Sequence, residues 1–207
     1  MSSASHQPPT SHANTTTLSN GVVMPLVGFG CAGKLNHVPI AHAIRAGYRL
    51  FDTSQATEWY LEESLGEALR HSGVPLPREE VFLTTKLHPR DLGEQSTLDA
   101  FPNSLKNLHT AYVDAFLLHY PRCFGNLCPP NGGQPAGTWR DSWRALETLY
   151  HRGLVKAIGV SNFSPDEFDE LISVAKVKPH LVQSWMDPLM QARPLRERCR
   201  THGVLFQ

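Results

Sequence analysis

The stretch GLVKAIGVSNFSPDEFDELISVA, residues 153–175, contains one complete strand–helix unit. The apolar run at 155–160 predicts a short buried strand, because polar and turn residues bound it on both sides. Ser164 then precedes Pro165, which is the arrangement of an N-cap followed by proline at the first helical position. A helix is therefore expected over 165–175.

The same alternation extends in both directions along the chain. Strands are predicted at 26–30, 48–52, 81–86, 114–119, 155–160 and 180–183, and a further strand begins at 204. Amphipathic helices are predicted at 38–46, 60–72, 96–110, 138–152, 165–175 and 194–202. Strands that alternate with helices are typical of a parallel α/β fold.

Two parallel α/β architectures fit this alternation. A doubly wound sheet would carry a Gly-x-Gly-x-x-Gly loop after its first strand, and Gly28, Gly30 and Gly33 match that spacing loosely. No helix opens directly on Gly33, and no acidic residue ends the second strand in the manner that binds a ribose. The alternative is an incomplete (β/α)8 TIM barrel with six βα units and the start of strand seven.

The N-terminal region differs from the rest of the chain. Residues 1–15 are rich in Ser, Thr, His and Pro and are expected to form a disordered tail, while residues 16–207 are expected to form one partial barrel domain. Residues 18–22 predict a β-hairpin, with Asn20-Gly21 in a type I′ turn.

A barrel of six strands and a fragment would expose two sheet edges, so we expect marginal stability.

Composition excludes several classes of protein. The formal net charge is +0, which gives no reason to expect binding to nucleic acid or to an anionic membrane. No apolar run approaches the roughly 20 residues of a membrane span. The four cysteines are expected to be reduced thiols in the cytoplasm, although Cys123 and Cys128 are close enough for a local disulfide or half of a metal site.

Polar residues follow the predicted strands at their C-terminal ends, where chemistry gathers in a barrel. These residues are Asp52, Lys86, His119, Ser161, Asn162 and Gln183. Each taken alone has a structural explanation, such as a helix cap for Asp52 or a core histidine for His119. All of them would converge on one rim of a barrel, and this joint pattern favours a functional site.

Four segments resemble the aldo-keto reductase superfamily. They are residues 47–53, 81–87, 112–119 and 153–163, and the last is the most specific. The resemblance implies an oxidoreductase that reduces aldehydes or ketones with NADPH. It implies that a tyrosine donates a proton, that Lys86 assists it, that Asp52 holds the lysine, and that His119 orients the carbonyl. A lysine ammonium beside the hydroxyl would favour the phenolate.

The catalytic tyrosine departs from the family pattern. The family usually places it about five residues after the aspartate, where this chain has Thr57, and the nearest tyrosine is Tyr60. A lengthened loop could still deliver Tyr60 to the site. The alternative is that Tyr60 packs in the following helix and that the acid is absent.

The resemblance also implies a cofactor site. Ser161, Asn162 and Gln183 match the residues that bind the nicotinamide carboxamide, Asp52 and Gly30 lie beside the cofactor, and Cys31-Ala32 replaces the usual polar or aromatic pair. Residues 121–137 occupy the place of a substrate-covering loop, and His88 could face the substrate. Other hypotheses are a weakly active or inactive barrel that senses nucleotides or binds protein, and a truncated product without function.

Overall fold

The computed structural model describes residues 14–207. Residues 14–207 contain a two-stranded antiparallel hairpin and a seven-stranded parallel sheet. The predicted disordered tail falls almost entirely outside these residues. Thr15, the last residue of that predicted tail, pairs with Pro25 in the hairpin.

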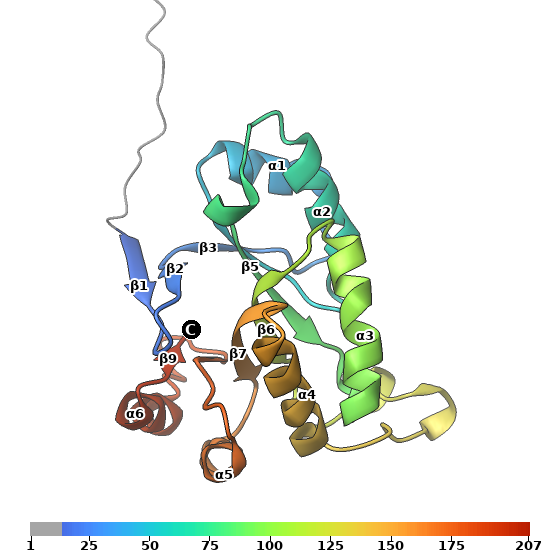
Figure 1. Cartoon of the computed structure of the whole chain (residues 1–207), viewed down its shortest axis with the longest axis vertical. Coiled ribbons are helices and arrows are strands. Elements are labelled where there is room, and N and C mark those ends of the chain that lie inside the picture. Colours follow the sequence, from blue (N-terminus) through green and yellow to red (C-terminus); the bar gives the residue numbers. More distant parts are fainter. Residues whose placement is uncertain (1–13) are drawn as a thin grey trace, which may run out of the picture.

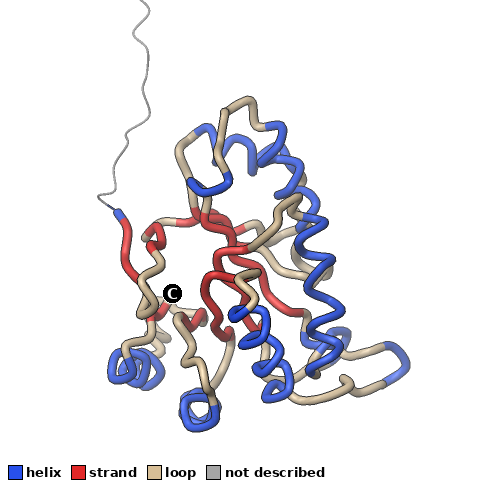
Figure 2. Tube along the Cα trace, viewed as in Figure 1, coloured by secondary structure: helices blue, strands red, loops and turns tan. Residues whose placement is uncertain are grey.

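The seven parallel strands follow one another around the sheet in the order of the sequence (Figures 1 and 2). They are β3 (Gly28–Gly30), β4 (Leu50–Asp52), β5 (Phe82–Leu87), β6 (Val113–Leu118), β7 (Val155–Ser161), β8 (Leu181–Gln183) and β9 (Leu205–Phe206). A doubly wound sheet would reverse its strand order at a switch point, and this order contains no reversal. The curled sheet is therefore part of a barrel, as predicted.

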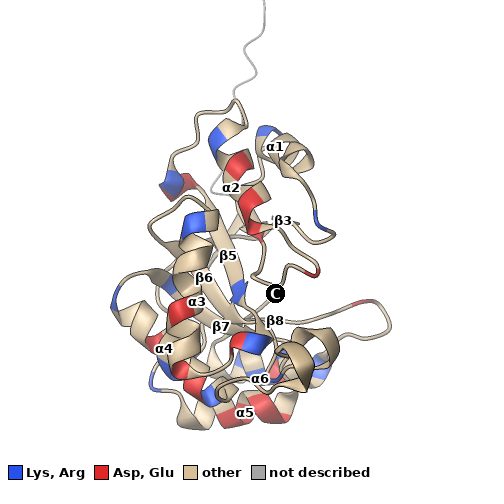
Figure 3. Ribbon diagram, turned by 90° about the vertical axis from the view of Figure 1, so that its right-hand side faces the viewer, with Lys and Arg blue, Asp and Glu red and all other residues tan. Residues whose placement is uncertain are grey.

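Six helices connect these strands and cover the outer face of the sheet (Figure 1). They are α1 (His37–Arg45), α2 (Glu62–His71), α3 (Glu94–Asn107), α4 (Trp139–His151), α5 (Pro165–Val174) and α6 (Arg193–His202). Helix α5 begins as predicted, because the Ser164 hydroxyl accepts a hydrogen bond from the Glu167 backbone N–H at 3.2 Å. Most charged residues lie on the helices and connections (Figure 3).

The strands have an inner and an outer face because successive side chains point to opposite sides. Outward-facing apolar residues pack under the helices, and examples are Phe51, Phe116 and Ile158, all at 0 % exposure. The inner face carries a smaller apolar cluster that includes Leu50, Ala115, Leu117, Ala157 and Leu181. This alternation decides which strand residues can reach the barrel interior.

The hairpin of β1 (Thr15–Thr17) and β2 (Val23–Pro25) covers the N-terminal end of the barrel. Leu18 and Met24 join the inner apolar cluster, and the Asn20 side chain donates to the Lys156 carbonyl at 2.8 Å. The hairpin was predicted, but its turn type was wrong. Only Gly21 of the Asn20-Gly21 pair has positive φ, at 86°, whereas a type I′ turn needs positive φ at both positions.

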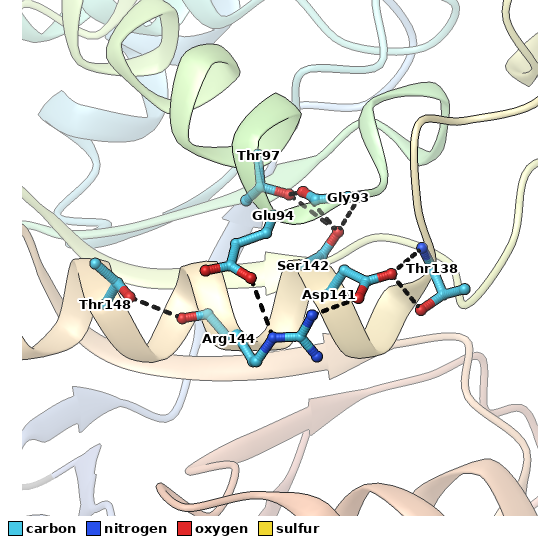
Figure 4. Close-up of polar contacts among 8 residues, drawn as sticks. All are labelled: Gly93, Glu94, Thr97, Thr138, Asp141, Ser142, Arg144 and Thr148. Atoms are coloured by element: carbon cyan, nitrogen blue, oxygen red, sulfur yellow. Dashed lines mark hydrogen bonds and ion pairs between the residues drawn. The ribbon is translucent and has the colours of Figure 1, made fainter.

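Helices α3 and α4 are joined by a polar contact that Figure 4 shows in close-up. The Ser142 hydroxyl accepts hydrogen bonds from the Gly93 N–H at 2.8 Å and from the Thr97 hydroxyl at 3.0 Å. The Asp141 carboxylate caps α4 by accepting from the Thr138 N–H at 2.7 Å. The connection before α4 is therefore anchored at its end. Among residues 14–207, no helix is long and apolar enough to cross a membrane.

Candidate active site

The predicted rim residues share one face of the sheet as well as one end of it. Asp52, Lys86, Ser161 and Gln183 each lie an even number of positions from an inward-facing residue of the same strand. Gly30 pairs with Asp52, and Ser161 pairs with Gln183. The same alternation places His119, two residues after Leu117, on the inner side. The polar residues predicted from the sequence therefore meet inside the barrel, at the C-terminal ends of its strands.

Asp52 and Lys86 form a buried ion pair at the centre of this group. The Lys86 Nζ lies 2.7 Å from the Asp52 Oδ2, and it also donates to the Thr53 carbonyl at 2.9 Å. The Lys86 side chain is 0 % exposed and that of Asp52 is 13 % exposed. The other carboxylate oxygen of Asp52 accepts from the Gln183 side chain at 2.9 Å, so β4, β5 and β8 are tied together across the barrel interior.

The lengthened loop does deliver Tyr60 to this group. The Lys86 Nζ lies 4.8 Å from the centre of the Tyr60 ring, and the rings of Tyr60 and His119 meet edge to face at 5.9 Å. Thr57, at the position usual for the family tyrosine, is exposed. The Tyr60 hydroxyl makes no hydrogen bond to residues 14–207, which leaves it able to bond a ligand.

The environment of Tyr60 raises the pKa of its hydroxyl instead of lowering it. The Lys86 Nζ lies over the Tyr60 ring, 4.8 Å from its centre. Burial raises the pKa of the Tyr60 hydroxyl to about 12, and the negative charge of Asp52 adds to the effect. The hydroxyl therefore keeps its proton at neutral pH, as a proton donor must.

His119 is held neutral. Burial, together with the positive charge of Lys86, lowers the pKa of His119 to about 3. Its Nδ1 is buried without a hydrogen-bond partner in residues 14–207, so Nε2 is the ring nitrogen that keeps access to solvent. Trp59 contacts the His119 ring edge to face at 5.8 Å, and Tyr120 stacks on it at 4.9 Å. A neutral imidazole beside Tyr60 can donate or accept one hydrogen bond.

The predicted nicotinamide ligands present unpaired acceptor atoms. The Asn162 Nδ2 is occupied by the His119 carbonyl and the Ser161 hydroxyl, both at 3.0 Å, and the Gln183 Nε2 is occupied by Asp52. The Asn162 Oδ1 and Gln183 Oε1 have no hydrogen-bond partner in the described part of the chain. Two amide oxygens near one hydroxyl suit a carboxamide, which has two N–H donors and one acceptor. The residues therefore fit the nicotinamide end of the cofactor.

These groups line a cavity of about 430 Å³ that opens at the C-terminal rim. Its walls include Trp59, Tyr60, His119, Ser161, Asn162 and Gln183. Trp59 and Tyr120 were missed from sequence, although Tyr120 directly follows a predicted site residue. Gly30 ends β3 with open space around its Cα, so the backbone there is accessible to a ligand.

Two expectations near the site are wrong. His88 does not face the cavity: its side chain is 1 % exposed, and its Nε2 lies 3.1 Å from the Glu58 Oε2. Cys123 and Cys128 are not free thiols, because they form a disulfide in the loop before α4. The short spacing of these two cysteines was the signal that could have indicated the bond. Cys31 and Cys199 are free and buried.

Comparison with known proteins agrees with the family resemblance seen in the sequence. The sequence profile of the Aldo/keto reductase family matches residues 35–206. The 9,11-endoperoxide prostaglandin H2 reductase of Trypanosoma cruzi is 39 % identical over 195 residues, which cover 92 % of this chain and 63 % of its relative. The glyoxal reductase of Bacillus subtilis is 37 % identical over 203 residues, which cover 96 % of this chain and 67 % of its relative.

The likeness extends to three dimensions. The aldo-keto reductase of Bombyx mori, solved in complex with NADP, superposes with a TM-score of 0.83 at 27 % identity, covering 94 % of this chain and 65 % of that one. The chain thus spans about two thirds of the length of the relatives it matches. From the profile match, the sequence identities and the shared fold, the chain belongs to the aldo-keto reductase family.

Proposed function

We propose that this chain is an NADPH-dependent oxidoreductase that reduces aldehydes or ketones to alcohols. The observation that carries the proposal is the grouping of four residues: the buried pair of Asp52 and Lys86 lies against Tyr60, and Tyr60 and His119 line one cavity. The cofactor is proposed from the donor and acceptor atoms of Ser161, Asn162 and Gln183, and from relatives such as the NADPH-dependent codeinone reductase of Papaver somniferum. When bound, NADPH supplies the hydride and leaves as NADP⁺.

The residues divide the remaining work. The Tyr60 hydroxyl donates its proton to the carbonyl oxygen while the carbonyl carbon gains hydride, so an alcohol forms and the tyrosine is left as a phenolate. The Lys86 ammonium, 4.8 Å from the ring, stabilises that phenolate. Asp52 keeps Lys86 charged and in place at 2.7 Å. A hydrogen bond from neutral His119 to the carbonyl oxygen orients the substrate.

The partner class that this site supports is a small carbonyl compound. The aromatic side chains of Trp59 and Tyr120 line the same cavity as the polar residues of the site, and they favour a substrate with an apolar portion. The cytoplasm is the compartment we propose for the chain, and the Cys123–Cys128 disulfide is the observation that argues against it.

Purified chain can be assayed for loss of NADPH absorbance with a panel of aldehydes and ketones, and for NADPH binding by fluorescence. We expect turnover that depends on both the carbonyl compound and NADPH. Tight NADPH binding without turnover of any carbonyl would support the nucleotide-sensing alternative. Failure to bind NADPH at all would contradict the proposal.

A further inference from the structure

The turn that carries Tyr60 is a compact unit between β4 and α2. The backbone N–H groups of Trp59 and Tyr60 both donate to the Ala56 carbonyl, at 3.0 and 2.9 Å. The Trp59 carbonyl accepts from the N–H groups of Gly33 and Lys34, both at 2.9 Å. These bonds fix the turn, residues 56–60, toward the loop after β3. They do not fix it toward β5, where Lys86 lies.

Glu58 supplies a side-chain connection from within the turn to the end of β5. Within the described residues, it is the only residue of turn 56–60 whose side chain forms a hydrogen bond, and its Oε2 lies 3.1 Å from the His88 Nε2. The His88 Nδ1 accepts from the Arg90 N–H at 3.0 Å, so the ring proton must be on Nε2. His88 therefore donates to Glu58 as a neutral imidazole. Burial and the charge of Arg90 lower the pKa of His88, which keeps the ring neutral.

Two contacts thus run side by side between the same two segments. Glu58 and Tyr60 lie on the turn, while Lys86 and His88 lie at the end of β5. Gln55, just before the turn, strengthens the same junction: its Oε1 accepts from the His88 N–H at 3.1 Å, and its Nε2 donates to Ser104 of α3 at 2.9 Å. The Gln55 N–H also donates to the Lys86 carbonyl at 3.0 Å, so the backbone fixes the start of the turn to β5. The Glu58–His88 bond then holds the turn itself against the end of β5.

We propose that the Glu58–His88 hydrogen bond is a positioning device that holds Tyr60 against Lys86 and His119 for proton donation. This proposal rests on the proposed carbonyl reduction by Tyr60. Neither Glu58 nor His88 touches the reacting atoms, so both act through the tyrosine. A misplacement of about 1 Å at a reacting group costs about 100-fold in rate, so a modest shift of the turn is enough to matter.

Three variants and a control test this proposal in the full chain. Glu58→Ala and His88→Asn remove the bond, whereas His88→Gln keeps an amide N–H that can reach Glu58. Glu63→Ala, on the exposed side of α2, is the control. We expect Glu58→Ala and His88→Asn to lower kcat about tenfold or more, to leave the KM for NADPH within about twofold, and His88→Gln to restore most of the loss.

The double variant Glu58→Ala/Tyr60→Phe separates positioning from general destabilisation. If Glu58 acts through Tyr60, the double variant is no slower than Tyr60→Phe alone, because the positioned group is already gone. An additional loss equal to that of Glu58→Ala alone would overturn the proposal. So would a Glu58→Ala variant with the same kcat as Glu63→Ala.

Hydrogen exchange tests the positioning without relying on activity. We expect the Trp59 and Tyr60 amides to exchange at least about tenfold faster in Glu58→Ala and His88→Asn than in Glu63→Ala, because the turn opens more easily. Unchanged exchange would overturn the positioning proposal even in an active enzyme. Faster exchange in a chain that reduces no carbonyl would support the positioning of Tyr60 and contradict the proposed reduction instead.

Discussion

The two ends of this partial barrel each carry an aspartate, a lysine and a tyrosine in contact. At the C-terminal end, Lys86 bonds Asp52 at 2.7 Å and lies 4.8 Å from the Tyr60 ring. At the N-terminal end, Lys156 pairs with Asp114 at 3.0 Å and lies 4.2 Å from the ring of Tyr112. The residue types and contacts are nearly the same, and the C-terminal set lies beside His119 and a cavity that Tyr60 and His119 line.

The two sets differ in how many of their polar atoms have hydrogen-bond or ion-pair partners. Asp114 also accepts from Arg78 at 2.6 Å and from the Leu83 N–H at 3.0 Å, and the Lys156 side chain is 40 % exposed. Lys86 is wholly buried with a single carboxylate, and Tyr60 and His119 beside it keep unpaired polar atoms. A saturated, solvated cluster holds strands together, whereas a buried cluster with unpaired groups can bind a ligand.

The largest expected difference between the two ends is in activity. Tyr60→Phe should lower kcat for carbonyl reduction by about 10²–10⁴-fold, because the proton donor is lost. Tyr112→Phe should leave kcat within about twofold. Steady-state kinetics measure both, and NADPH fluorescence should show that cofactor binding survives in each. Equal activity of the two variants would end the functional distinction between the clusters.

A second difference concerns stability. Asp52→Asn leaves the buried Lys86 charge without its partner and should lower the free energy of unfolding by about 3–5 kcal/mol. Asp114→Asn should cost only about 1–2 kcal/mol, because solvent reaches both Arg78 and Lys156. Urea unfolding followed by circular dichroism gives both values. A larger loss for Asp114→Asn would reverse the contrast.

His119, which is buried at the C-terminal end, should affect the pH dependence of stability. The pKa of His119 is about 3 in the folded chain, compared with about 6.5 when unfolded, so the unfolded state binds more protons between these values. Its contribution to stability is complete above pH 6.5 and is lost as the pH falls toward 3, by up to about 1.4 kcal/mol per pH unit.

Unfolding of His119→Asn measured across that range checks this expectation. The variant should lose stability less steeply with falling pH than the unmodified chain does. His151→Asn, on the exposed surface of α4, serves as the matched control and should keep the steep dependence. Parallel curves for His119→Asn and the unmodified chain would show that His119 is protonated in the folded state.

The smallest effect is expected for the exposed lysine of the N-terminal end. Lys156→Met removes a partner of Asp114 that is 40 % exposed, while Arg78 remains paired with the same carboxylate. The free energy of unfolding should change by less than about 1 kcal/mol, and kcat should not change. A loss of several kcal/mol would mean that this cluster, like that of Asp52, depends on every charge it holds.

Much of the site could be predicted because it follows from alternation along short strands. Asp52, Lys86, His119, Ser161 and Gln183 each end a recognisable apolar run, and parallel strands bring such ends together. The sequence left two positions open for Tyr60, one in the site and one packed in the following helix. The length of a loop does not determine where a side chain points. The contact between Tyr60 and Lys86 resolved its position in favour of the site.

Other features depended on contacts between distant segments. His88 and Glu58 are 30 residues apart, and no local pattern distinguishes a histidine that faces a substrate from one that bonds a neighbouring turn. The turn of the hairpin followed the same rule, because its bonds set the conformation of Asn20 and the Asn-Gly preference alone did not.

The sequence by itself determined the order of strands and helices, the end of the sheet where polar residues gather, and the residues available there. These properties are local, because they follow from hydrophobic periodicity and capping within short stretches. Only the tertiary structure decided which Asp–Lys–Tyr cluster keeps unpaired groups, where Tyr60 points, and which cysteines pair. Those outcomes depend on burial and on distances between segments far apart in the chain, and a linear pattern contains neither.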